Sequence, residues 1–214
     1  MARRRYDNSA RLDAASLTRH RIIDATTTLL GEGGYAGLSV AAVASAAGVS
    51  PQTIYNAIGG KGALLKACYD ITLAGDKDAV PMSQRPEFLA LGQASSAVEY
   101  LAGYAVWVRV LHERVAGIVG PILALDAARD AGAAEFLTSI ERERFVGSTH
   151  AMTRLHDRFR LPDGLTVEKA VDTCWTLNSP ELYVRLVVRC GWTPDAFQTW
   201  LARQLQASLL PHGA

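Results

Sequence analysis

The chain has 214 residues, of which 49% are hydrophobic and 20% are charged, a balance that is typical of a globular protein and excludes a disordered one. The net charge is only +1, but residues 1–75 carry eight Lys and Arg against five Asp and Glu, and residues 76–214 carry fourteen against sixteen. No run reaches the roughly 18 apolar residues of a membrane-spanning helix, and the N-terminus lacks an apolar signal-peptide core, so we expect a cytoplasmic protein.

The first segment of the chain is rich in arginine, with six Arg against two Asp in residues 1–21. We expect residues 1–15 to form a mobile basic arm, with Arg4 inside a run of three arginines, because clustered positive side chains bind phosphate groups. The apolar periodicity of residues 18–32 then predicts an amphipathic helix, which the pair Gly33-Gly34 ends.

Residues 39–61 carry the most specific pattern, SVAAVASAAGVSPQTIYNAIGGK. Ser39 is a good N-cap for a short helix that Gly48 ends, because glycine adopts the left-handed conformation at the lowest cost. Ser50 then caps a second helix, and Pro51 takes its first position, where a missing N–H does no harm. Two short helices joined by a three-residue turn are the helix-turn-helix that many DNA-binding proteins use.

The second of these helices is expected to face a DNA groove. Its apolar side chains Ile54 and Ile58 lie four residues apart and face inward. The outward side chains are polar and uncharged, and such groups hydrogen-bond base edges and phosphate oxygens: Gln52, Thr53, Tyr55 and Asn56. An ordinary capped helical hairpin is the alternative that the spacing leaves open.

The rest of the chain predicts further helices and no strands, so the expected fold class is all-α. A loop is expected at 75–86, and the helices are expected at 61–74, 95–116, 119–130, 133–160, 166–189 and 194–210, with breaks at glycine and proline. The three cysteines form no CxxC pair, which excludes a zinc site, and Cys174 and Cys190 are interpreted as buried. The expected domains are a basic arm (1–15), a helix-turn-helix domain (16–60) and an effector-binding and dimerisation domain (61–214).

The helix-turn-helix segment resembles the TetR family of bacterial transcriptional regulators. The resemblance lies in Gly34-Tyr35, Ser39-Val40, Ala47-Gly48-Val49-Ser50, Thr53-Ile54-Tyr55 and Lys61-Gly62-Ala63-Leu64-Leu65, and it departs where Ile58 replaces a usual Phe and Gly62 a common Glu. It implies that Thr53 and Tyr55 contact the DNA backbone, that Gln52 and Asn56 help to select the sequence, and that Lys61 meets a phosphate. The complete expected DNA-binding set is Ser39, Ser50, Gln52, Thr53, Tyr55, Asn56, Lys61 and Arg4.

The C-terminal region resembles the helix pair through which members of this family dimerise. The resemblance lies in residues 174–183 and 191–195, and it implies a four-helix interface between two copies. Periodicity supports this, because Phe197, Trp200, Leu201, Leu205 and Leu209 form an apolar stripe. Packing on its own chain is the alternative for this stripe. The expected interface residues are Trp175, Leu182, Leu186, Phe197, Trp200, Leu201 and Leu205.

The middle of the chain would hold the effector pocket that the resemblance implies. One predicted helix face carries Tyr100, Tyr104, Trp107 and Leu111, and His150 and Trp175 complete the expected set of effector-binding residues. Aromatic side chains with polar tips orient ligands in apolar pockets, although such a stripe is more often part of a core.

Signals of catalysis fail one by one. His112-Glu113 begins an HExxH-like run, but Ala116 stands where the second ligand is needed, and neither a phosphate-binding loop nor a Gly-x-Ser-x-Gly motif is complete. We therefore expect a homodimeric, non-enzymatic regulator without a cofactor, which binds a palindromic operator in double-stranded DNA and represses until an unknown small molecule releases it. An activator, a helical ligand-binding module without DNA binding and a small helical enzyme remain as alternatives.

Overall fold

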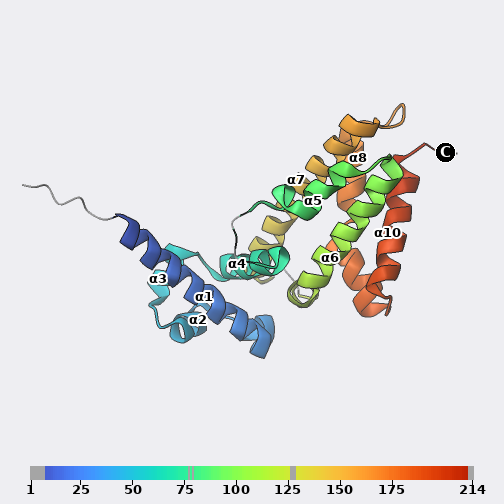
Figure 1. Cartoon of the computed structure of the whole chain (residues 1–214). Helices are drawn as coiled ribbons and strands as arrows, with labels where there is room; N and C mark the ends of the chain where they lie inside the picture. Colours follow the sequence, from blue (N-terminus) through green and yellow to red (C-terminus); the bar gives the residue numbers. More distant parts are fainter. Residues whose placement is uncertain (1–7, 77, 79, 126–128, 212–214) are drawn as a thin grey trace, which may run out of the picture. The chain divides into compact units, whose positions relative to one another are not determined.

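A computed structural model describes residues 8–76, 78, 80–125 and 129–211, and the side chains from residue 14 onward. Every regular element in these ranges is a helix, which confirms the all-α class (Figure 1). None of the helices within the described ranges combines the length and apolar character that crossing a membrane requires.

Helices follow one another along the described part of the chain. The first four are α1 (Asn8–Gly37), α2 (Val40–Ala47), α3 (Pro51–Ala57) and α4 (Lys61–Ala74). Short turns follow, namely η1 (Met82–Gln84), α5 (Pro86–Ala90) and η2 (Leu91–Gln93). The remaining elements are α6 (Ala97–Leu123), α7 (Ala131–Phe159), α8 (Val167–Leu177), α9 (Pro180–Tyr183), the π-helical stretch η4 (Val184–Arg189) and α10 (Pro194–Leu209).

The chain divides into two compact units. The N-terminal unit contains residues 1–70 and 125–136, and the C-terminal unit contains residues 71–124 and 137–214. Helices α4 and α7 therefore both begin in the N-terminal unit and end in the C-terminal unit. The beginning of α7 is far from the helix-turn-helix in sequence, and its place in the N-terminal unit was not predicted.

The N-terminal unit is built around a small apolar core. Helix α1 packs against α2 and α3 (Figure 1). The core side chains of this unit are fully or almost fully buried, and they come from the first four helices and from the link between α1 and α2: Ile22, Leu38, Val43, Ile54, Leu64 and Leu65. Burying such side chains contributes roughly 1.5–3 kcal/mol each, which is how helices as short as α2 and α3 are held.

Helix α1 begins earlier than its sequence pattern predicted. The expected start at residue 18 and the expected arm over residues 1–15 are wrong for residues 8–15, which are helical. This stretch contains Ala, Leu and Arg and no Gly or Pro, so nothing in it stops a helix from extending. The expected stop at Gly33-Gly34 is a kink, because Gly34 has φ 59° and ψ −163° before a last turn to Gly37.

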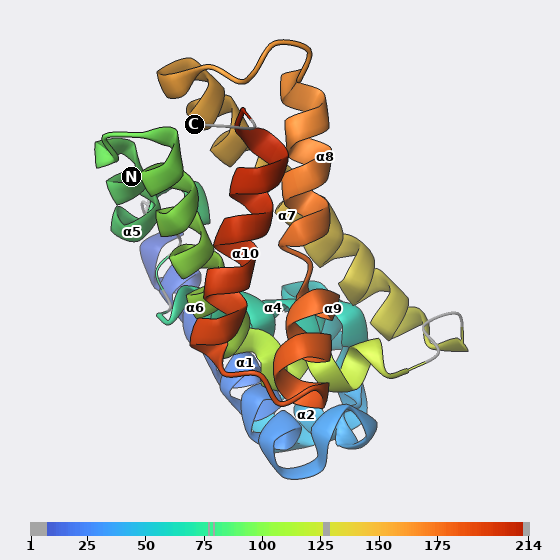
Figure 2. The same cartoon turned by 90° about the vertical axis from the view of Figure 1, so that its right-hand side faces the viewer.

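In the C-terminal unit α6, α8 and α10 run alongside one another (Figure 2). The apolar stripe of α10 faces this bundle, and Phe197, Leu201 and Leu205 are 0% exposed in the single chain. The prediction that these three side chains form a dimer interface is therefore wrong, because they have no surface left for a partner. Packing on the chain's own helices was the alternative, and it holds for them.

Several predicted helix boundaries in the C-terminal unit are also wrong. Helix α6 runs through Gly120-Pro121 to Leu123, because a proline near a helix end removes only one hydrogen bond of the last turn. The expected helix 166–189 breaks after Leu177, where Ser179 caps α9 and Pro180 begins it. The turns between 82 and 93 were not predicted as helical. Cys174 is buried as expected, but Cys190 is exposed.

Candidate nucleic-acid interface

The turn between α2 and α3 is held by local hydrogen bonds that the sequence predicted. The amide of Ala42 donates to Oγ of Ser39 over 3.1 Å, which caps the start of α2. Gly48 ends α2 in the left-handed conformation at φ 63°, and the amide of Val49 donates to the carbonyl of Ala44 over 3.0 Å. Because an L side chain at φ 63° is strained, glycine is the favoured residue at this point.

Helix α3 begins with a double contact between two side chains. The amide of Thr53 donates to Oγ of Ser50 over 3.1 Å, and the two hydroxyl oxygens lie 2.9 Å apart within hydrogen-bond distance. Pro51 occupies the first helical position. These contacts fix where α3 begins, and therefore which of its side chains face outward.

The outward face of α3 is polar, uncharged and open to solvent. Ile54 is fully buried under the helix, whereas Gln52, Tyr55 and Asn56 are exposed, Tyr55 by 55%. Nε2 of Gln52 donates to Oδ1 of Asn56 over 2.9 Å, which holds the two amides side by side. This pair keeps Oε1 of Gln52 and Nδ2 of Asn56 for other partners, and amides of this kind pair with adenine in the major groove.

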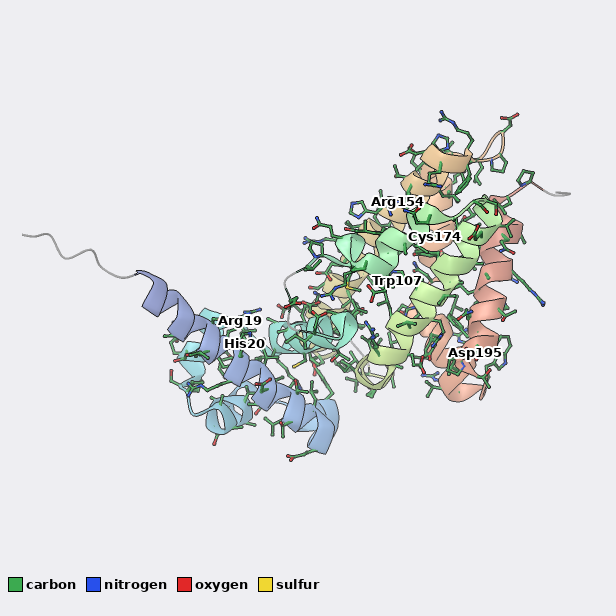
Figure 3. All side chains as sticks on the ribbon, viewed as in Figure 1. Arg19, His20, Trp107, Arg154, Cys174 and Asp195 are labelled. Carbon is green, nitrogen blue, oxygen red and sulfur yellow. The ribbon has the colours of Figure 1, made fainter. Side chains whose placement is uncertain are left out.

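The C-terminal end of α3 is tied to α1 by an arginine that the sequence did not indicate. Nη1 of Arg19 donates to the backbone carbonyl of Ala57 over 2.9 Å. Figure 3 shows Arg19 on α1 where that helix passes α3. Helix C-termini carry partial negative charge, so a guanidinium there both neutralises the end and holds the position of α3.

Lys61, the expected phosphate ligand, lies at the first position of α4 and is half-buried. Its Nζ lies 3.7 Å from the centre of the Tyr35 ring, a cation–π distance. The Tyr35 hydroxyl donates to Oδ1 of Asp130 over 2.5 Å, and the amide of Ala133 donates to the same oxygen over 2.9 Å. The hydrogen bond from Tyr35 is the main reason why the pKa of Asp130 is lowered, and Lys61 lowers it further.

Asp130 therefore joins the first turn of α7 to the core of the N-terminal unit. Burial and the Asp130 carboxylate together raise the pKa of Tyr35, which stays a neutral donor. Gly62 on α4 lies close to the start of α7, and there is no room for a Cβ at this position. An added Cβ would lie 2.8 Å from the carbonyl oxygen of Gly132 and 2.9 Å from Cβ of Glu135. The departure from the common Glu at Gly62 is thus required by packing.

The expected DNA-binding residues fall into one group with two outliers. Ser50, Gln52, Thr53, Tyr55 and Asn56 lie together on α3 and its cap. Ser39 caps α2, and Lys61 begins α4. Arg4 lies outside the described residues.

The residues that the sequence missed are those that support this group. Arg19, Asp130 and Gly132 lie in segments far from the motif, so no local spacing signalled them. Gly62 was noticed only as a departure from the family pattern.

The expected effector-binding residues lie in the core of the C-terminal unit. Tyr100 is 0% exposed, and its hydroxyl donates to the carbonyl of Ala151 over 2.9 Å. The hydroxyl of Tyr104 accepts a hydrogen bond from Nδ2 of Asn178 over 2.7 Å, and Trp107 is buried against Phe88. These contacts give the three side chains structural roles, and their role in effector binding remains a prediction.

The other expected effector residues are more accessible. Leu111 and Trp175 are half-buried, and His150 is exposed on α7. In the part of the chain that the structure describes, no three His, Cys, Asp or Glu side chains gather in a way that could hold a metal ion.

Comparison with known proteins identifies the N-terminal region. Residues 22–68 match the family of bacterial regulatory proteins known as the tetR family, a span that contains α2, α3 and the turn between them. No curated protein matches the sequence.

Solved structures share the fold over most of the chain. A TetR-family transcriptional regulator from Syntrophomonas wolfei has a TM-score of 0.62 at 13% identity, covering 90% of this chain and 95% of that one. FadR from Bacillus subtilis, solved with stearoyl-CoA, has a TM-score of 0.59 at 18% identity, covering 87% and 96%. SmeT of Stenotrophomonas maltophilia, in complex with triclosan, has a TM-score of 0.58 at 17% identity, covering 92% and 93%.

At these identities the likeness to the solved structures is one of fold, and the family match rests on the helix-turn-helix region. The motif residues that match the family are also those that the structure places on α2, α3 and the start of α4. Residues 22–68 are therefore identified as a helix-turn-helix region of the tetR family of bacterial regulatory proteins, and the chain shares its fold with the solved structures.

Proposed function

We propose that the protein is a repressor that binds a palindromic operator as a homodimer and leaves it when a small molecule binds to the C-terminal unit. The observation that carries DNA reading is the exposed, uncharged face of α3, with Gln52 and Asn56 paired over 2.9 Å on a helix that is capped at Ser50 and held by Arg19. A helix on the surface of a protein without such a role more often carries Glu and Lys.

The proposed dimer follows from the size of α3, which has seven residues. A helix of this length reaches only a few base pairs, so a single copy has little sequence to read. Two copies related by a twofold axis would place their α3 helices on half-sites about 34–36 Å apart, or a multiple of that spacing. The operator should then be an imperfect palindrome.

Apolar side chains around α9 and η4 are the surface that we propose for dimerisation. Val188 is 62% exposed and Trp192 38% exposed, and the ring of Trp192 lies 6.4 Å from that of Trp200. Leu182, Leu186 and Trp200, which the sequence predicted for the interface, are half-buried in the same region. We keep these three as interface residues together with Val188 and Trp192.

Release by a small molecule is proposed from the architecture and from the neighbours. FadR was solved with stearoyl-CoA and SmeT with triclosan, so proteins of this fold hold small molecules of different chemistry. In this chain α7 contributes to both units, and its first turn is bound to Tyr35 through Asp130. A ligand that shifts α7 would thus bear on the unit that carries α3, to the extent that its affinity differs between the two states.

The experiment that tests this function couples DNA capture to transcription. Genomic fragments bound by the purified chain would be placed ahead of a reporter gene, and expression would be measured with and without the protein. We expect expression to fall when the protein is present and to recover with Asn56→Ala. Expression that rises with the wild-type chain would make it an activator. A chain that captures no fragments would fit the ligand-binding module instead.

A further inference from the structure

The C-terminal unit contains an open pocket of about 360 Å³ between α7 and the segment of η1 and α5. Ser83 and Phe88 line one wall, and the α7 wall is formed by His150, Thr153, Arg154, Asp157 and Arg158. Figure 3 shows Arg154 on this helix. Apart from His150, none of these residues was expected to bind a ligand.

The nitrogen-bearing side chains of the α7 wall share one face of the helix. His150, Arg154 and Arg158 are spaced four residues apart, so their side chains follow one another along the pocket. Thr153 and Ser83 add hydroxyl groups. The wall thus presents hydrogen-bond donors over about two turns of helix, and Asp157 is the only carboxylate among the residues that line the pocket.

Both guanidinium groups are held in place by backbone carbonyls and aromatic rings. Arg154 lies 5.2 Å from the centre of the Phe88 ring and donates from Nη1 to the Phe88 carbonyl over 3.4 Å. Arg158 donates from Nη2 to the carbonyl of Ala94 over 2.9 Å. An arginine has five N–H donors, so each keeps several that can turn toward a ligand.

Neither of these two arginines forms an ion pair with a carboxylate within the described residues. Arg85, Arg109 and Arg144 each form an ion pair there, at 2.5–2.7 Å. Arg154 and Arg158 form none, and their contacts are to neutral carbonyl oxygens and rings. The favourable end of the helix dipole accounts for Arg158 in the last turn of α7, but not for Arg154 further back.

We infer that this pocket binds a small organic anion, with its carboxylate or phosphate on Arg154 and Arg158 and its apolar body toward Phe88. Planar guanidinium groups match the geometry of carboxylates and phosphates, and such charge-assisted hydrogen bonds are about twice as strong as neutral ones. The idea that an effector acts on α7 through this pocket depends on the proposed function, a repressor that a ligand releases. The binding of an anion there does not depend on that function, because it is inferred from the contacts of Arg154 and Arg158 alone.

The test uses the full chain and two matched pairs of probes, measured by isothermal titration calorimetry at low salt. Benzoate and phenyl phosphate carry the anion, and benzamide and phenol are their neutral counterparts. We expect saturable binding of at least one of the two anions, with its neutral counterpart at least about tenfold weaker. Arg154→Gln and Arg158→Gln should each weaken binding of that anion by about tenfold or more.

Arg142→Gln is the matched control. Arg142 is exposed on the same helix and does not line the pocket, and its substitution removes the same charge. It should leave the affinity within about twofold of wild type. If Arg142→Gln weakened binding as much as the pocket variants do, the effect would be one of general electrostatics and the site would be overturned. The site would also be overturned if neither anion bound, or if the neutral probes bound as tightly as the anions. Arg158→Gln also covers the case in which Arg154→Gln fails to fold, since Arg158 is exposed.

Operator binding, measured separately on the same preparations, distinguishes this inference from the proposed function. Wild-type chain that binds operator but no anion would overturn the pocket and leave the regulator standing. If the wild-type chain bound the anion through Arg154 but bound no DNA, the pocket would be supported and the proposed regulator would be contradicted.

Discussion

Single residues hold the start of α7 against the helix-turn-helix unit, and Gly62 shows this most clearly. Gly62 is the second residue of α4, and within helices Ala is normally favoured over Gly, by up to about 1 kcal/mol. At Gly62, however, an added Cβ would come within 2.5 Å of a Glu135 carboxylate oxygen and within 2.8 Å of the Gly132 carbonyl oxygen. The flexible carboxylate can move, but the backbone carbonyl moves only if the first turn of α7 shifts away.

Gly62→Ala should therefore destabilise the protein by about 1–3 kcal/mol, the usual cost of overpacking, in spite of its better helix propensity. Gly147→Ala is the control, because no atom lies within 4 Å of the Cβ it would add and its backbone is helical. That control should be neutral or stabilising by up to about 1 kcal/mol. Urea unfolding measures the free energy of unfolding of both variants. A Gly62→Ala protein as stable as Gly147→Ala would contradict the close packing around Gly62.

His112 is a second residue whose surroundings determine its behaviour. It is buried at 8% exposure, and its Nε2 lies 2.8 Å from the carbonyl oxygen of Asn178, to which it can donate. Its pKa is lowered from an ordinary 6.5 to about 4, mainly because the side chain is buried; the Asn178 carbonyl opposes this shift and the Arg144 guanidinium adds to it. The folded protein therefore keeps this histidine neutral at pH values where the unfolded chain would protonate it.

The stability that neutral His112 contributes should be complete above about pH 6.5 and should be lost as the pH falls toward 4. The loss at pH 4 is on the order of 3 kcal/mol, because each unit of pKa difference corresponds to about 1.4 kcal/mol. His112→Gln cannot take up the proton, so its unfolding free energy should fall less steeply over this range. His150→Gln, an exposed control, should keep the wild-type slope; equal slopes in His112→Gln and wild type would contradict the account.

At the scale of elements, the caps show what a sequence can predict. Ser50-Pro51 begins α3 and Ser179-Pro180 begins α9, and in each case the serine Oγ accepts a hydrogen bond from the amide three residues on. The first break was predicted because a glycine precedes it, whereas the second was missed because no glycine marks it. Local signals thus predicted the helix-turn-helix well, since its geometry depends on neighbours in sequence.

Elements whose partners lie far away in sequence could not be predicted in the same way. The apolar stripe of α10 signalled a buried face, but periodicity does not say whether α6 of the same chain or a second copy covers it. The join between Tyr35 and Asp130 links residues 95 positions apart. No spacing rule reaches across that distance, so the role of α7 in the N-terminal unit came only with the structure.

Removing the cap of α3 should weaken both the fold and DNA binding. Ser50→Ala deletes the acceptor of the Thr53 amide and the partner of its hydroxyl, which should cost about 1 kcal/mol of unfolding free energy. Ser50→Asp should restore the cap and most of the stability, but its negative charge beside the phosphates should still lower the affinity for duplex DNA.

Thermal unfolding and fluorescence anisotropy on a labelled duplex separate these two effects. Ser45→Ala, on the exposed surface of α2 and without a capping role, should leave both quantities nearly unchanged. If Ser50→Asp bound DNA as tightly as wild type, the cap would not lie near the phosphates.

At the scale of the whole molecule, the proposed regulation requires two copies, and the apolar surface around η4 is the place where we expect them to meet. Val188→Glu would put a charge on a side chain that is 62% exposed in the single chain. Burying that charge in an interface is unfavourable, so the dimer dissociation constant should rise by at least about tenfold. Sedimentation equilibrium measures it, with Val98→Glu as the control because Val98 is 53% exposed on α6. A dimer that tolerates Val188→Glu as well as Val98→Glu would place the interface elsewhere.

The central claim is that α3 reads a palindromic sequence, and the most direct measurement is selection of duplexes from a random pool by the full chain. Wild-type protein should enrich a motif with two inverted half-sites, and Asn56→Ala should change the preferred base at matching positions in both halves. Enrichment of no motif by folded protein would contradict the claim, and a motif that Asn56→Ala leaves intact would remove α3 as its reader.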